Sequence, residues 1–228
     1  MATCKWCNKS GWFLSLTANG LCKNCDPIVV LNVSQATRII NESVTLIEKS
    51  NNLDTQLSRC NVIIIKSEEL LPYEQRHINT INPKPSELIS QYIKKKDDLI
   101  LKSIDQDLDK IVRQIPFSDN HKPLINNLNK LLAKIDKYKP ELYNKTYTDQ
   151  HYRLTLKTIA ELRFNYHLKE AERAKFKSQL KKALDHYYEA LYLINTDETV
   201  SSIFSEKIND IERNINLLGG TLLKSPIQ

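Results

Sequence analysis

The sequence predicts a mostly α-helical protein with a small cysteine-rich module at its N-terminus. Four of the five cysteines lie in the first 25 residues, and from residue 27 onward apolar residues recur at helical spacing. The 228 residues include only four glycines, which are too few for a turn-rich β fold. We therefore divide the chain into a module of residues 1–26 and a helical domain of residues 27–228.

The cysteines of the module form two Cys-x2-Cys pairs, Cys4 with Cys7 and Cys22 with Cys25, separated by 14 residues. Each pair can wrap a tight turn around one metal ion, and four thiolates complete the tetrahedron that Zn²⁺ prefers in closed structural sites. Disulfides, a thioredoxin-like redox motif or an iron–sulfur cluster would also use cysteine. The paired spacing and the absence of a βαβ pattern favour zinc, so we predict one structural Zn²⁺ held by these four residues.

The segments beside the cysteines predict a small finger. Residues 12–16 form a short β-prone run, Asn19-Gly20 predicts a hairpin turn, and Asp26-Pro27 predicts the start of a helix. A knuckle, a hairpin and a helix start, in this order, resemble a treble-clef finger, or a zinc ribbon if the helix is absent, over residues 4 to about 30. The resemblance implies binding of DNA, RNA or protein, or stabilisation of a chain end.

Trp6 and Trp12 are candidate partner contacts, because aromatic rings can stack on nucleic-acid bases. In so small a module they can instead form a miniature core together with Phe13, which is the interpretation we favour. Few positive charges lie nearby, so we expect a structural or protein-contacting role before a nucleic-acid one; they are Lys5, Lys9 and Lys23.

Residues 27–228 predict one helical domain, because apolar residues recur three or four positions apart between clear breaks. The expected helices cover about 27–50, 53–71, 86–115, 122–138, 148–175, 179–195 and 197–218, with Pro72 ending the second and Gly219-Gly220 the last. Neighbouring helices pair into three antiparallel hairpins, followed by a capping helix; the hairpins are 27–72, 86–140 and 148–196.

The segment from Phe164 to Asp197 resembles a tetratricopeptide repeat. That family places small residues where two helices cross, and four alanines match this pattern, at positions 171, 174, 183 and 190. Tyr187 occupies the aromatic position, and Asn195 replaces the usual closing proline. The first helices of the second and third hairpins are longer than in that family, which leaves a bundle-like all-α domain as the alternative.

The resemblance implies a concave groove made by the first helix of each hairpin, suited to a segment of a protein partner. Four side chains are expected to face this groove: Asn165, Leu168, Glu172 and Lys175.

No constellation of an enzyme is present in the sequence. The five histidines are scattered, and neither a phosphate-binding loop nor a nucleophile elbow occurs. A zinc ion held by four thiolates has no open position for water. The net charge of +6 is compatible with nucleic-acid contact without requiring it.

We expect a cytoplasmic protein without membrane contact, because no apolar leader precedes Cys4 and the longest apolar run, residues 62–65, is short. The predicted function is that of a non-enzymatic adaptor that binds a protein partner through its helices. A nucleic-acid-binding or regulatory subunit using the finger, and an accessory subunit of a multi-chain enzyme, are the alternatives. The composition, rich in Asn, Ile and Lys, is typical of an AT-rich bacterial or phage genome; the partner, the pathway and the oligomeric state stay open.

Overall fold

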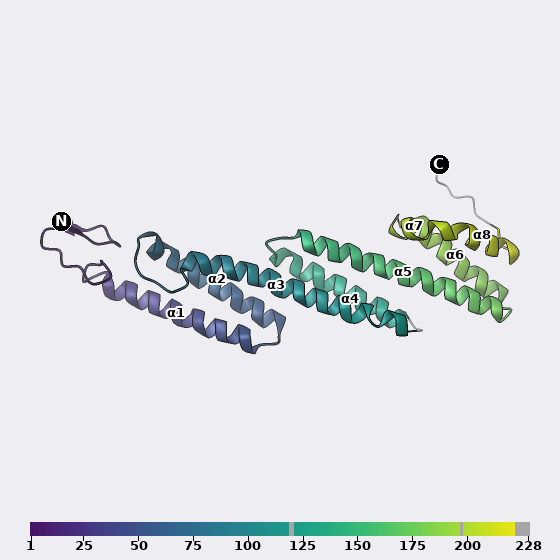
Figure 1. Cartoon of the computed structure of the whole chain (residues 1–228), viewed down its shortest axis with the longest axis horizontal. Helices are drawn as coiled ribbons and strands as arrows, with labels where there is room; N and C mark the ends of the chain where they lie inside the picture. Colours follow the sequence, from purple (N-terminus) through teal and green to yellow (C-terminus); the bar gives the residue numbers. More distant parts are fainter. Residues whose placement is uncertain (119–120, 197, 222–228) are drawn as a thin grey trace. The chain divides into compact units, whose positions relative to one another are not determined.

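The computed structural model describes residues 1–118, 121–196 and 198–221, apart from the side chain of Thr199. These residues form mainly α-helices, preceded by one two-stranded sheet (Figure 1). The chain divides into two compact units. Unit 1 contains residues 1–103 and 141–144, and unit 2 contains residues 104–140 and the chain from residue 145 onward.

Unit 1 begins with the cysteine-rich module. Strand β1 (Ala2–Thr3) pairs antiparallel with β2 (Ser10–Gly11), so the sheet flanks the first Cys-x2-Cys pair. The strand predicted at residues 12–16 is wrong, because Trp12 and Phe13 lie in a turn after β2. The predicted turn at Asn19-Gly20 is present, with hydrogen bonds between Thr17 and Leu21 and between Gly20 and Thr17, but the strands beside it are reduced to an isolated bridge between Leu16 and Cys22.

Helices α1 (Asp26–Lys49) and α2 (Leu53–Gln75) pack against each other as the predicted first hairpin (Figure 1). The Asn52 side chain caps α2 by accepting a hydrogen bond from the backbone N–H of Thr55 at 3.0 Å. Pro72 was predicted to end this helix, but α2 continues through it to Gln75. The reason is tertiary, because Tyr73 is buried and its ring packs on Trp6.

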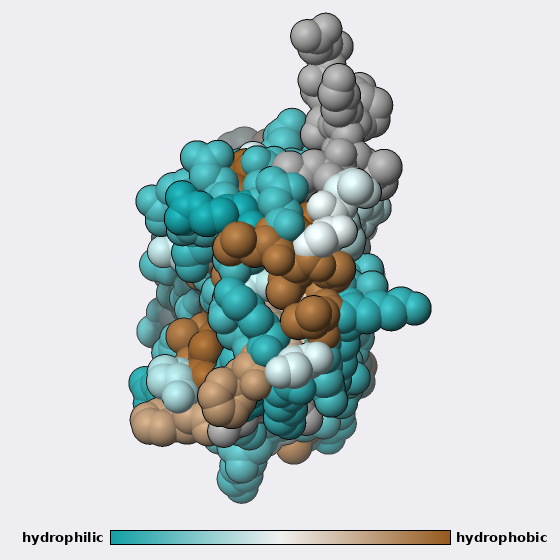
Figure 2. Space-filling view, turned by 90° about the vertical axis from the view of Figure 1, so that its right-hand side faces the viewer, coloured by the Kyte–Doolittle hydropathy of each residue, from teal (hydrophilic) through white to brown (hydrophobic). Residues whose placement is uncertain are grey.

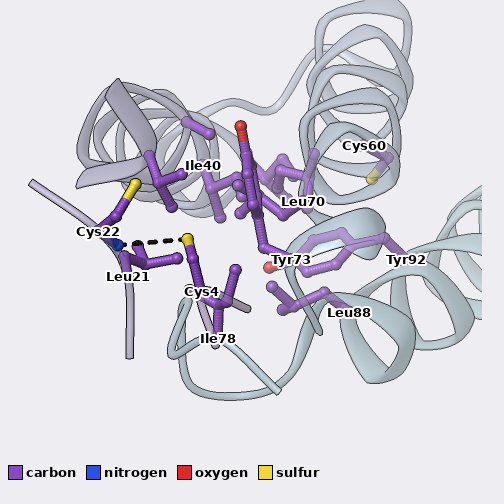
Figure 3. Packing of buried hydrophobic residues seen from close by; sticks show 14 residues of the cluster. Cys4, Leu21, Cys22, Ile40, Cys60, Leu70, Tyr73, Ile78, Leu88 and Tyr92 are labelled. Carbon is purple, nitrogen blue, oxygen red and sulfur yellow. Dashed lines mark hydrogen bonds between the residues drawn. The ribbon is translucent and has the colours of Figure 1, made fainter. Parts of the chain in front are cut away.

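The core of unit 1 includes the module as well as the helices. Cys4, Leu21 and Cys22 are buried in the same apolar cluster as Ile40 of α1 and Leu70 of α2 (Figure 3). The cluster extends to the N-terminal part of α3 (Pro85–Val112), which contributes Leu88 and Tyr92. The 26 residues of the module therefore do not rely on a core of their own.

Unit 2 contains the C-terminal part of α3 and the remaining helices. Its elements are η1 (Ile115–Phe117), α4 (Lys122–Tyr138), the first residues of η2 (Lys139–Glu141), α5 (Thr146–Phe176), α6 (Leu180–Thr196), α7 (Glu198–Phe204), η3 (Ser205–Lys207) and α8 (Ile208–Leu217). The predicted helix 197–218 is divided at η3, and Asp197 lies outside the described residues. The glycine stop is confirmed, since Gly219 has φ of +80° and the backbone N–H of Gly220 donates to Ile215.

Helices α5 and α6 form the most closely packed hairpin of unit 2. The four alanines predicted at their crossing are all buried, and Tyr187 is buried beside them. Helix α7 packs against both helices of this hairpin. The ring of Phe204 on α7 stacks on the ring of Phe164 on α5, with centroids 4.2 Å apart. Small residues thus let α5 and α6 approach closely, while aromatic rings fill the space next to them.

The surface is mixed in character. Figure 2 shows apolar side chains in brown between hydrophilic ones on one face. Exposed apolar residues of unit 2 include Phe176, Leu180 and Leu217. None of the described helices combines the length and the apolar character that crossing a bilayer requires.

Candidate metal centre

The two cysteine pairs come together as predicted. The sulfur atoms of Cys4, Cys7, Cys22 and Cys25 all lie within 4.8 Å of one another, and the Sγ atoms of Cys7 and Cys22 are 3.9 Å apart. Two sulfurs bound to one tetrahedral Zn²⁺ at about 2.3 Å are separated by about 3.8 Å, so a small contraction completes the geometry. Cys4 and Cys22 are buried, Cys25 is half-buried and Cys7 is exposed. The four thiols could therefore hold one metal ion.

Backbone N–H groups already favour thiolate at two of the four positions. Burial opposes ionisation of Cys4, but N–H groups of Cys7, Cys22 and Trp6 lower its pKa to about 6; the bond from the Cys22 N–H to the Cys4 sulfur measures 3.2 Å. The N–H of Cys25 lowers the pKa of Cys22. The hydrogen bond with Cys22 raises the pKa of Cys25 to about 12. A bound cation would bring all four thiols to the thiolate form.

The second cysteine turn is fixed by a glycine and by the start of α1. Gly20 has φ of +73°, and a Cβ at this position would lie 2.8 Å from the Lys5 side chain. The Asp26 carboxylate accepts hydrogen bonds from Thr17 at 2.7 Å and from Asn19 at 2.9 Å. Asp26 was expected to cap the helix, but Cys25 occupies the N-cap position and Asp26 instead ties the turn to α1.

The C-terminal end of α2 and the two residues after it contact the first cysteine turn. The Trp6 ring lies 4.7 Å from the Tyr73 ring, and the Arg76 guanidinium lies 4.6 Å from the Trp6 ring centroid. Arg76 also donates a hydrogen bond to the Trp6 carbonyl, and Lys5 donates to the carbonyl of His77 at 2.7 Å. The sequence did not indicate these contacts, because Tyr73, Arg76 and His77 follow the cysteines by about 50 residues and belong to no motif.

The two tryptophans have different roles. Trp6 is half-buried between Tyr73 and Arg76, as expected for a core residue. Trp12 is 83% exposed and Phe13 is fully exposed, so the expectation that both belong to a miniature core is wrong. The module is too small to enclose them, and its apolar contacts go to α1 and α2 through Cys4, Leu21 and Cys22 instead.

The four groove candidates all lie on α5, far along the chain from the cysteines. Asn165 is exposed, and Leu168 is half-buried against the core of unit 2. Glu172 accepts a hydrogen bond from the Tyr187 hydroxyl, and Lys175 donates to Asn214 of α8 at 2.7 Å. Two of the four therefore already have partners within the chain.

No family model, curated protein or solved structure matches this chain.

Proposed function

We propose that this protein is a non-enzymatic adaptor whose N-terminal finger, built around one structural Zn²⁺, presents a contact surface to a protein partner. In this proposal the helices of unit 1 that share a core with the finger support that surface. The cytoplasm is the compartment we assign to it, since a reducing environment keeps four neighbouring cysteines as thiols.

The assignment of zinc rests on the chemistry of the donor set. Four sulfur atoms within 4.8 Å of one another suit Zn²⁺ better than a hard, oxygen-seeking ion. With all four positions taken by protein, the ion would stabilise the module and would have no site for a substrate. This closed ligand set supports a structural role for the metal.

The observation that carries the adaptor proposal is the exposure of Trp12 and Phe13. Two adjacent aromatic side chains at 83% and 103% exposure lose contact with water only when another molecule covers them. Tryptophan is enriched among residues that dominate binding energy at protein interfaces. Strand β2 and the braced cysteine turns would hold the backbone that carries both rings before a partner arrives, which lowers the entropic cost of ordering this loop on binding.

The hairpin of α5 and α6 is a second contact region in this proposal. Its buried alanines and Tyr187 are consistent with a tetratricopeptide-like unit, whose exposed first helix would carry Asn165. The residues engaged within the chain, Glu172 and Lys175, would then shape the hairpin as well as face a partner.

Nucleic-acid binding through the finger is the alternative that one observation favours. Residues 1–25 contain three lysines and no acidic residue, so a polyanion would meet little repulsion there. Stacking of bases on Trp12 and Phe13 would then supply the apolar contact. Several phosphate contacts would make such binding fall steeply with salt.

Site-specific photo-crosslinking in the native cell separates the two functions. A photoreactive amino acid at Phe13 should yield a discrete protein adduct that survives nuclease treatment. The matched control places it at Phe117, which is 91% exposed on η1 and should yield no such adduct. Nuclease-sensitive adducts at position 13 would establish the alternative, and equal yields at both positions would contradict a specific contact.

A further inference from the structure

Two histidines of unit 2 face each other across the hairpin of α5 and α6. The Nδ1 atoms of His167 on α5 and His186 on α6 are 3.2 Å apart, and both rings are half-buried. They were treated as scattered residues in the sequence, because 19 positions separate them. Only the antiparallel packing of the two helices brings them together.

The geometry of this pair suits a metal ion as well as a proton. When both rings are neutral, one Nδ1–H donates to the other Nδ1, so a single hydrogen occupies the space between them. Two imidazole nitrogens bound to one tetrahedral Zn²⁺ at about 2.0–2.1 Å lie about 3.3 Å apart. The observed separation of 3.2 Å matches this spacing, so rotation of the two rings within the hairpin would direct both Nδ1 lone pairs at one ion.

The surroundings disfavour a second proton on the pair and place one acidic group nearby. Burial and then the charge of His186 lower the pKa of His167, against a smaller opposing effect of Glu189, which lies one helical turn after His186 and is exposed. Glu170, one turn after His167, is occupied by an ion pair with Arg173 at 2.9 Å. The Tyr166 ring meets both imidazoles edge-on, with centroids 5.3 Å and 6.1 Å away, and covers one side of the pair.

From this geometry we infer that His167 and His186 form a second metal site, which takes a divalent transition metal ion through both Nδ1 atoms. Imidazole nitrogen suits Zn²⁺, Ni²⁺ and Cu²⁺, whereas Mg²⁺ and Ca²⁺ prefer oxygen. On binding, the ring that carries the shared hydrogen at Nδ1 loses it to solvent and takes up another at Nε2. Both rings stay neutral in this exchange, and water completes the coordination.

An ion bound at this site would link α5 to α6. The site differs from the cysteine centre in its donors, its exposure and its place in the chain, so the two sites are predicted to fill independently. A metal that binds the folded hairpin and not the unfolded chain raises the stability of unit 2. Zinc bound at the cysteines would not supply this effect, because the cysteines belong to unit 1.

The test uses the full chain, loaded with one equivalent of Zn²⁺ and labelled with ¹⁵N in its histidine rings. Further Zn²⁺ should shift the Nδ1 resonances of His167 and His186 and leave those of His77, His121 and His151 in place. Calorimetry should record a second equivalent of bound Zn²⁺. If excess Zn²⁺ moves neither resonance, the pair is a hydrogen bond only and the inference is overturned.

Matched variants separate ligation from folding. The variants His167→Gln and His186→Gln keep a polar side chain at the site. Each variant should no longer bind the second equivalent of Zn²⁺, while circular dichroism should show unchanged helix content. His151→Gln, on the same helix, removes an imidazole whose Nε2 lies against Asp105 and whose Nδ1 lies against the Tyr147 carbonyl, and this variant should still bind the second equivalent of Zn²⁺. Persistence of the second equivalent in both His167→Gln and His186→Gln would also overturn the inference.

Discussion

At the scale of single residues, the contact between Trp6 and Arg76 joins the finger to the helices. The guanidinium lies over the indole ring and donates to the backbone carbonyl of the same residue. A cation over an aromatic ring contributes about 0.5–1 kcal/mol at exposed sites, and a hydrogen bond contributes a similar amount. Trp6 lies between Cys4 and Cys7, so this contact also restrains the first cysteine turn.

We predict that Arg76→Ala lowers the free energy of unfolding by about 1 kcal/mol, measured by urea titration of the metal-bound protein. Arg38→Ala serves as the control, because Arg38 forms only an exposed pair with Glu42 on α1 at 3.6 Å. Such pairs typically contribute less than about 0.5 kcal/mol. Equal losses in the two variants would mean that Arg76 does not brace the finger.

At the scale of elements, the connection between α2 and α3 depends on one carboxylate. Glu74 accepts two hydrogen bonds from Ser86, from its backbone N–H at 3.0 Å and from its hydroxyl at 2.7 Å. The Ser86 hydroxyl, its backbone N–H and then the Lys84 charge lower the pKa of Glu74, against a smaller opposing effect of burial. The carboxylate thereby satisfies an N–H in the first turn of α3, which has no partner within the helix.

This contact predicts a contribution to stability that depends on pH. Because the pKa of Glu74 is lower in the folded chain, the contribution is fully present above the ordinary carboxyl pKa of about 4.3. It is lost as the pH falls through the lowered folded value. Urea titrations should give the free energy of unfolding at neutral and at acidic pH. The decrease between the two pH values should be smaller for Glu74→Gln than for the wild type. In a Ser86→Ala background the same substitution should have a smaller effect, because only the backbone N–H at position 86 still donates to Glu74; an undiminished effect there would refute the pairing with the hydroxyl.

At the scale of the whole molecule, the metal centre is a structural part of unit 1. Buried Cys4, Leu21 and Cys22 belong to the same cluster as Val29, Ile40 and Tyr73. In small zinc modules the free energy of metal binding is largely free energy of folding. Removal of the metal should therefore affect the helices that share this cluster.

We predict that a chelator lowers amide hydrogen-exchange protection in the finger, in the N-terminal half of α1 and around Tyr73 of α2. Protection in α5 and α6 should stay unchanged, because unit 2 has its own apolar cluster. The Cys4→Ser, Cys22→Ser double variant should reproduce this pattern without chelator. Loss of protection confined to residues 1–25 would contradict the shared core, and full metal content in the double variant would contradict the ligand assignment.

The local pattern of the sequence predicted which cysteines come together and where most helices lie. Two Cys-x2-Cys pairs predict a four-sulfur centre because each pair closes its own turn, whatever the rest of the chain does. The helix expected at residues 122–138 is α4 within those bounds, since its apolar stripe and Pro123 are local signals. The long helices expected at 86–115 and 148–175 were predicted in the same way and are α3 and α5.

Tertiary contacts decided what local signals could not. Helix α2 continues past Pro72, and Tyr73 packs on Trp6. The residues two positions after the ends of α2 and α5 are His77 and Ser178, which have positive φ although neither is a glycine. The last predicted helix divides at η3, although residues 198–217 contain neither glycine nor proline. Only packing could show that Trp6 is braced while Trp12 and Phe13 are exposed, and that His167 meets His186. Burial and the meeting of distant residues depend on how helices pack, and a sequence pattern records only which residues share a helix face.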